Sequence, residues 1–305
     1  MLALAEWVFL VLSIAQFTLG LLVNGFIGLV NGRDWLKSKR MSLSDFLITS
    51  LALSKIVLLL LLLAHGVSVV FSLKDHSARM FVQMTDLFWT FTNHLNIWLA
   101  TCLGVFYCLK VASFSHPVFL WLKWRVSRVV VWMLLVSLLL SCSSTVSLIG
   151  EFKAYSDLSG IDDTGNTTEH KRKKCHRYKM IHVLGTLWYL PPLVVSLASY
   201  FLLILSLGRH TRQMRHIGVS SRDPSTEAHK RATKLILSFL FLFLLYFLAF
   251  LIASSSYFLP EAKMAVMAGE VITMLSLASH SVVLILGNPK LTQAFVGLLR
   301  VSLGI

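Results

Sequence analysis

The sequence predicts an all-α integral membrane protein, a bundle of seven transmembrane helices whose N-terminus lies outside the cell. Three observations predict this fold: the composition, the long charge-free runs and the placement of the basic residues. Of the 305 residues, 56% are hydrophobic and only 14% are charged, whereas a soluble domain carries roughly 25% charged residues. A soluble fold of this length could not bury so much apolar surface, so we expect a lipid-facing exterior.

Seven apolar runs are long enough to span a bilayer. A spanning helix needs about 20 mainly apolar residues, because the hydrocarbon core is about 30 Å thick. None of the runs alternates with a period of two, as a β-barrel strand would, and backbone groups in lipid must be satisfied internally, so the runs are expected to be helices. We expect one domain, residues 1–305, with helices at about 7–32, 46–73, 82–110, 128–150, 180–208, 232–259 and 264–288.

The basic residues predict the orientation of the bundle. With the N-terminus outside, the loops on the cytoplasmic side carry the larger share of Lys and Arg, as membrane proteins generally do. The run from Lys171 to Lys174 opposes this orientation, but the same loop holds the sequon Asn166-Thr167-Thr168. Glycosylation acceptors face the lumen, so Asn166 is a candidate glycosylation site. The net charge of +14 does not indicate a nucleic-acid partner, because the basic residues lie in short segments between apolar runs.

The sequence shows no sign of enzymatic or metal chemistry. Of the four cysteines only Cys175 lies in a polar loop, so no disulfide framework is expected, and no zinc-type spacing of Cys and His occurs. The catalytic signatures of serine hydrolases, zinc proteases and P-loop enzymes are all absent. We therefore expect neither an enzyme nor a bound cofactor or metal.

Polar side chains on the third helix mark a candidate pocket. Trp89, Asn93 and Asn96 are spaced i, i+4, i+7 and share one helix face, and His94 is adjacent to that face. Such groups in the outer half of a span fit a small-molecule pocket, in which a few polar groups orient a ligand among apolar ones. The alternative is that Asn and His only join helices by hydrogen bonds.

Two residues on later helices are further pocket candidates. Glu270 lies near the outer end of the seventh helix, where it either faces the cavity or contacts headgroup water. Tyr246 lies in the outer half of the sixth helix and either lines the cavity or packs within the bundle. Ionisable residues inside a membrane are costly, so each is a hypothesis about function.

Three more residues concern the interior of the bundle. Lys55 lies within the second helix and either joins an internal polar cluster with Asn24 or extends its ammonium group to the membrane interface. Pro192, expected within the fifth helix, removes a backbone hydrogen bond and permits a kink at which a switching helix bends, although many such kinks are static.

Several motifs are typical of one family. The longest series runs from Phe88 through the following inner loop to Arg125. The remaining pieces are Lys39–Phe46, Ser206–His210, Ala228–Ala232, His280–Ser281 and Leu284–Leu291. Together they resemble the type 2 bitter taste receptors, which are G-protein-coupled receptors, over essentially the whole chain.

The resemblance implies a multi-pass receptor of the plasma membrane with bitter small molecules as agonists. It implies a heterotrimeric G-protein partner of the gustducin type, an alpha subunit with beta-gamma. The ligand contacts expected from the face of the third helix and the motif positions are Trp89, Asn93, His94, Asn96, Tyr246 and Glu270. The residues expected to serve the helix core and activation are Asn24, Lys55, Tyr107, Pro192, His280 and Ser281. The residues expected to contact the G protein are Lys110, His116, Lys123, Arg125, His210, His229 and Lys230.

Two other classes of protein remain as alternatives. A channel or transporter would need charged side chains along a path through the midplane, and only Lys55 qualifies. A rhodopsin-like receptor would carry an acidic residue at the position of Lys55. It would also carry an Asp-Arg-Tyr motif, and Tyr107 stands here at the position of that arginine. The type 2 family usually has arginine at Lys55, and a lysine lacks arginine's planar fork of donors. After Asn288 we expect a short interfacial helix.

Overall fold

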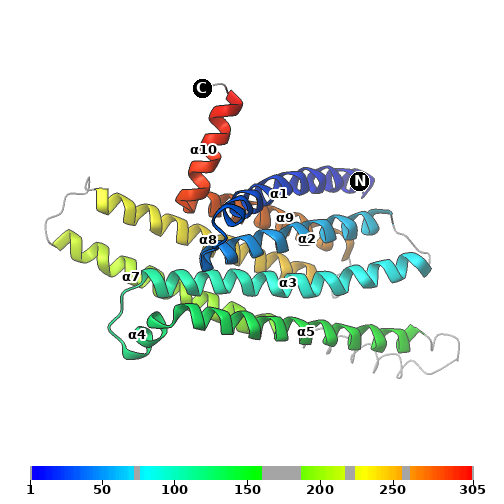
Figure 1. The fold of residues 1–305 in the computed structure, drawn as a ribbon. Coiled ribbons are helices and arrows are strands. Elements are labelled where there is room, and N and C mark those ends of the chain that lie inside the picture. The colour runs from blue at the N-terminus through cyan, green and yellow to red at the C-terminus, as the bar shows by residue number, and fades with distance from the viewer. Residues whose placement is uncertain (1, 72–75, 160–186, 217–223, 256–261, 304–305) are drawn as a thin grey trace.

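The computed structural model describes residues 2–71, 76–159, 187–216, 224–255 and 262–303, and their regular elements are all helical (Figure 1). Seven of the helices are long and apolar enough to cross a membrane, which confirms the expected fold class. They are α1 (Leu2–Ser38), α2 (Leu43–Phe71), α3 (His76–Val111), α5 (Val126–Ser159), α7 (Leu190–His216), α8 (Pro224–Ser255) and α9 (Ala262–Gly287). The shorter helices are α4 (Pro117–Trp124), the 3-10 turn η1 (Leu187–Tyr189) and α10 (Pro289–Leu303).

Successive long helices alternate in direction, so the starts of some helices share one end of the bundle with the finishes of the others (Figure 1). We use the term amino end for the end at which α1, α3, α7 and α9 begin, and carboxyl end for the end at which they finish. The short connections between α1 and α2 and around α4 lie at the carboxyl end, and α10 extends from it across the bundle axis (Figure 1).

The long helices extend beyond their apolar runs. The apolar run predicted α1 at about 7–32, whereas the helix continues to Ser38 through Arg33, Asp34 and Lys37. Helical hydrogen bonding does not require lipid, so an apolar run gives only the minimum length of a spanning helix.

The entry to α7 differs from the expectation. This helix begins at Leu190 directly after η1, so Pro191 and Pro192 lie in its first turn. The first N–H groups of a helix have no intrahelical acceptor, and proline is tolerated there without breaking the ladder. Pro192 therefore opens α7 and does not interrupt it, and the stretch 180–186 lies outside the described residues.

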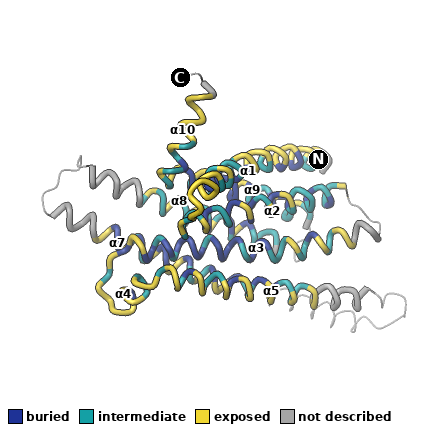
Figure 2. Tube along the Cα trace, viewed as in Figure 1, coloured by how far each residue is buried: buried dark blue, intermediate teal, exposed yellow. Residues whose placement is uncertain are grey.

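Helix α3 is the centre of the bundle. It packs against α2, α5 and α7, and 67% of its span is buried, compared with 22% for α5 and 28% for α1 (Figure 2). The outward faces of the surrounding helices expose large apolar side chains. These include Trp7, Leu22, Leu29, Trp132, Leu139 and Phe201. So large an apolar exterior would be a liability in water and is appropriate to lipid.

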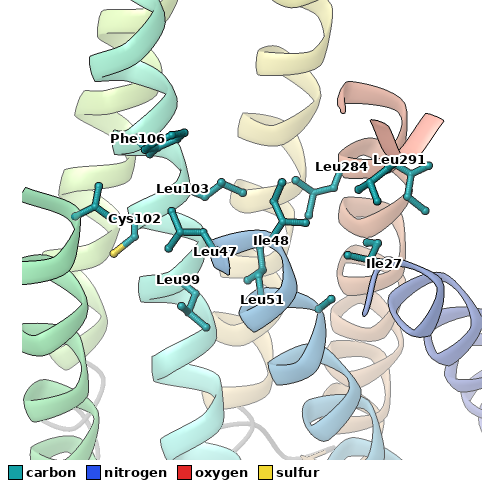
Figure 3. Close-up of a cluster of buried hydrophobic side chains, with 13 residues drawn as sticks. Ile27, Leu47, Ile48, Leu51, Leu99, Cys102, Leu103, Phe106, Leu284 and Leu291 are labelled. Carbon is teal, nitrogen blue, oxygen red and sulfur yellow. The ribbon is translucent and has the colours of Figure 1, made fainter. Parts of the chain in front are cut away.

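A cluster of buried hydrophobic side chains holds the carboxyl half together (Figure 3). Ile27 of α1, Leu47 and Leu51 of α2, and Leu284 of α9 all belong to it. Leu291 of α10 is fully buried in the same cluster, which fastens α10 to the bundle.

The start of α10 follows from its sequence. The Asn288 side chain accepts hydrogen bonds from the backbone N–H groups of Lys290 at 3.0 Å and Leu291 at 3.4 Å. Asn is a favoured N-cap and proline is favoured at the first helical position, here Pro289. The helix expected after Asn288 is therefore present.

The contact between α8 and α9 generates the first prediction. A Cβ atom on Gly269 would lie 2.9 Å from the Cβ of Ala253 and 3.1 Å from the carbonyl oxygen of Ala249. Backbone atoms cannot yield as a flexible side chain does, so we expect Gly269→Val to destabilise the bundle by about 1–3 kcal/mol. The measurement is the melting midpoint of the purified protein.

Gly28→Val is the matched control, because a Cβ there meets no described atom within 4 Å. Equal midpoints for the two variants would show that α8 and α9 do not approach as closely as described.

Candidate functional site

The Asn93 side chain lies at the centre of a buried polar group in the amino half of the bundle. Its Nδ2 donates to the hydroxyl of Tyr189 at 3.3 Å, and its Oδ1 accepts from the hydroxyl of Tyr246. Asn93 is fully buried, and the two tyrosines are less than a tenth exposed. One amide thereby joins α3 to η1 and to α8.

Trp89 lies one turn from Asn93, toward the amino end. Its ring stacks on Phe250 of α8 with 6.3 Å between centroids and 19° between planes, and Phe250 also contacts Tyr189 at 4.4 Å. The indole Nε1 of Trp89 is buried and has no hydrogen-bond partner within the described residues. Buried donors are nearly always satisfied, so this one is available to an acceptor that enters the site.

His94 faces away from Trp89. Its Nε2 donates to the backbone carbonyl of Trp188 at 3.0 Å, and its Nδ1 lies 2.9 Å from the hydroxyl of Ser141 on α5. The ring is fully buried, and both nitrogens are satisfied by the protein itself. This geometry makes His94 a bridge between helices, the role that the sequence left open beside ligand contact.

Glu270 is buried at the amino end and is already paired. Its Oε1 accepts a hydrogen bond from the Nδ1 of His65 on α2, and the Nε2 of His65 lies 4.0 Å from the Asp86 carboxylate on α3. Sequence analysis missed His65, a single histidine in the second apolar run. That isolation within a span was the available signal.

A second polar cluster lies deeper in the bundle. The Nζ of Lys55 is 2.8 Å from the Nδ1 of His280 and 2.9 Å from the hydroxyl of Ser281. The Ser281 hydroxyl in turn donates to the Oδ1 of Asn24 at 2.7 Å. Lys55 is only 2% exposed, so its ammonium group stays inside the bundle and does not extend to the interface.

A small cavity separates the two polar clusters. Its volume is about 30 Å³, and the residues that line it include Asn96, Tyr246, Lys55 and His280. The carbonyl oxygen of Asn96 also accepts from Ser54 of α2 at 3.0 Å. Small-molecule sites measure about 300–1,000 Å³, so side chains of this bundle must move apart to admit a ligand.

The comparisons with known proteins decide the family. The model of the family described as Taste receptor protein (TAS2R) matches residues 1–302. The chain belongs to this family. It is 69% identical to Taste receptor type 2 member 3 of Papio hamadryas, over 99% of this chain and 96% of that protein. It is 67% identical to the protein of that name from Homo sapiens, over 100% and 96%, and 56% identical to the one from Mus musculus, over 98% and 95%.

Membership confirms the resemblance that the motifs indicated. The chain is a bitter taste receptor with seven membrane-spanning helices, and it belongs to a receptor family and not to an enzyme family. The receptor is accordingly a multi-pass membrane protein.

The residues expected to meet the G protein lie at the carboxyl end, in different environments. Lys123 donates from its Nζ to the carbonyl of Ala112 at 2.8 Å, which satisfies the end of α3. Arg125 is exposed and stacks over Trp121 at 4.9 Å, and His116 is exposed before α4. Arg125 and His116 thus remain open to a partner.

Tyr107 and Lys110 frame the last turns of α3. Tyr107 is half-buried against Phe106, and the exposed Lys110 lies over the Phe106 ring at 5.1 Å. The structure does not describe the side chains of His210, His229 and Lys230, and Asn166 lies outside the described residues.

Sequence analysis also missed a cluster around Lys290. Its Nζ lies 2.9 Å from the Asp34 carboxylate, 3.0 Å from the Oδ1 of Asn31 and 3.4 Å from the Asp45 carboxylate. Burial lowers the pKa of Lys290, but hydrogen bonds to Asp34 and Asp45 and their negative charge raise it, and the net shift is upward. The ammonium group stays charged at neutral pH and ties α1, α2 and α10 together.

The bridging role of His94 generates the second prediction. We expect His94→Phe to lower the free energy of unfolding by about 2–3 kcal/mol, because it deletes two hydrogen bonds and leaves the Trp188 carbonyl unsatisfied. Thermal unfolding of the purified receptor measures this change. His116→Phe is the control, since His116 is exposed and its side chain makes no capping bond. An unchanged midpoint for His94→Phe would contradict the bridge.

Proposed function

We propose that the receptor binds bitter small molecules in the amino half of the bundle, among α3, η1, α7, α8 and α9. Trp89, Asn93 and Tyr246 are the proposed contacts, with Asn96 and Glu270 bordering the site. The observation that carries this proposal is the Asn93 amide between two buried tyrosine hydroxyls, beside the unpaired indole N–H of Trp89.

The chemistry of these groups fits an uncharged or weakly polar ligand. Trp89 and Phe250 offer apolar ring faces, and Asn93 offers both a donor and an acceptor once a tyrosine moves aside. A ligand acceptor that reaches the Trp89 N–H satisfies a buried donor, so its binding gains a hydrogen bond without breaking one. The Glu270 carboxylate is already paired with His65, so a cationic group is not required of the ligand.

Signalling then follows from the position of Tyr246. This residue bonds to Asn93 and also lines the cavity that Lys55 and His280 line. A ligand that replaces the Tyr246–Asn93 bond releases α8 from α3 and alters the cavity below it. Because a ligand shifts a two-state equilibrium only through contacts that differ between the states, this bond is the proposed switch. Asn24, Ser281, Tyr107 and Pro192 support the switch from the helix core.

The partner proposed at the carboxyl end is a G protein of the gustducin type, an alpha subunit with beta-gamma. The exposed Arg125, His116 and Lys110 offer positive and hydrogen-bonding groups there, while Lys123 positions α4 against α3. This assignment requires the amino end to face outside, as the basic-residue bias favours, with Asn166 as a glycosylation acceptor on that side. The site of action is the plasma membrane.

The third prediction tests the pocket by removing the indole N–H of Trp89. Trp89→Phe keeps an aromatic ring and removes the indole N–H. We expect it to raise the half-maximal agonist concentration about tenfold, the effect of losing one hydrogen bond of about 1.4 kcal/mol. Asn93→Ala should raise it further, because it deletes a donor and an acceptor. The measurement is the calcium response of cells that co-express a gustducin-type chimeric alpha subunit, across a panel of bitter compounds.

Trp132→Phe is the matched control, because Trp132 is 63% exposed on the lipid-facing side of α5. Surface levels of each variant are quantified in parallel. If Trp89→Phe and Trp132→Phe respond alike to every agonist, Trp89 does not contact the ligand. A response through other alpha subunits but not through the gustducin type would overturn the partner assignment.

A further inference from the structure

The amino group of Lys55 is buried and has no carboxylate partner among the described residues. Within the described residues the ion pairs of basic side chains with carboxylates involve His65, Lys263 and Lys290, and none involves Lys55. Its two bonding partners, His280 and Ser281, are a ring nitrogen and a hydroxyl. Taking an ion out of water is strongly unfavourable unless an opposite charge or a full set of hydrogen bonds replaces the water.

The hydrogen bonds of Lys55 are also incomplete. An ammonium group has three N–H donors and no acceptor. The Ser281 hydroxyl donates its proton to Asn24, so its oxygen accepts from Lys55. The Nδ1 of His280 accepts a second bond from Lys55. No acceptor among the described side chains takes the third N–H, and Lys55 lines the small cavity between α2, α3, α8 and α9.

The cavity wall has the character of an anion site. A cavity needs about 10–15 Å³ to hold one water molecule, so the volume of this cavity, about 30 Å³, leaves room for a somewhat larger monatomic ion. Asn96 accepts a hydrogen bond from Ser54 through its carbonyl oxygen and also bonds to the Tyr246 hydroxyl, so both of its polar groups have protein partners. The lining residues include no Asp or Glu, and the rest of the wall is largely apolar.

We propose that this cavity binds a small monovalent inorganic anion, chloride in particular, with Lys55 as its cationic partner. Water in the cavity would accept the third N–H but would leave the charge of Lys55 unbalanced. An anion does both. The other lysines in ion pairs, Lys263 and Lys290, obtain their counter-charge from carboxylates, and the anion takes that place at Lys55.

The bound anion also connects the two polar clusters. It lies in a cavity lined by residues of α2, α3, α8 and α9, among them Lys55, Asn96, Tyr246 and His280, so its loss loosens α8 and α9 against α2 and α3. The inference stands on the deep cluster alone and does not depend on which ligand occupies the outer site.

The test is the melting midpoint of the purified receptor in lipid nanodiscs, across a concentration series of sodium chloride balanced with sodium gluconate. Sodium and ionic strength stay constant, and bromide replaces chloride in a second series. Gluconate is too large for the cavity. A ligand that binds only the folded state raises the midpoint until its site is saturated, so we expect a saturable rise of a few degrees with chloride and with bromide. Identical midpoints in chloride and gluconate would overturn the proposal.

Variants distinguish chloride binding in this cavity from a general effect of salt on stability. Lys55→Met keeps an unbranched side chain without the charge and should abolish the saturable rise. Lys110→Met, at an exposed lysine of α3, should retain it. A chloride-dependent rise that persists in Lys55→Met would assign the effect elsewhere and overturn the proposal. If Lys55→Met folds poorly, the chloride and gluconate series on the wild-type receptor still tests the proposal.

Discussion

A bilayer offers no hydrogen-bond partners, so each polar side chain that the bundle buries must be satisfied within the protein. The described structure meets this constraint for most of its buried groups in two ways, and the indole N–H of Trp89 is an exception. Many hydroxyls bond to the carbonyl four residues earlier in their own helix, as Ser68, Thr85 and Thr273 do. Larger groups must find partners on other helices, and these cross-helix bonds position the helices against one another.

The cross-helix bonds form layers along the bundle axis. Lys263 and Glu6 join α9 to α1, and His65 and Glu270 join α2 to α9. Asn93 with its two tyrosines follows, then the cluster around Lys55, and finally the cluster around Lys290 at the carboxyl end. Movement at one layer therefore reaches the next through helices whose relative position each layer fixes. Such a connected series offers a physical route by which an event at one end can affect the other.

The sequence predicts some of these features well, for an identifiable physical reason. Hydrophobic length is a property of each segment alone, so the seven spans were predictable without knowledge of their neighbours. The shared face of Trp89, Asn93 and Asn96 follows from helical periodicity alone. The partners of Asn93 and Asn96 were not predictable, because Tyr189, Tyr246 and Ser54 reach them only when separate helices adopt a particular relative depth and rotation. The placement of Pro192 at the start of α7 likewise depends on η1, which no apolar run indicates.

His94 and Trp89 lie on the same helix, but their hydrogen bonding gives them different roles. His94 has both ring nitrogens bonded to the protein, so a ligand could engage it only by breaking bonds that hold α5 and η1. Trp89 has a free donor in an aromatic environment, so the protein gains by admitting an acceptor.

Hydrogen-bond donors can also be counted against their partners at Lys55, where the family resemblance leads one to expect arginine. A guanidinium group carries five donors in a plane, whereas lysine carries three on a flexible stem. The partners here, His280 and Ser281, satisfy two of those three. An arginine would extend further and fill space that the lysine leaves as a cavity of about 30 Å³. The substitution therefore reduces the number of donors to be satisfied and at the same time creates room for a separate group beside the charge.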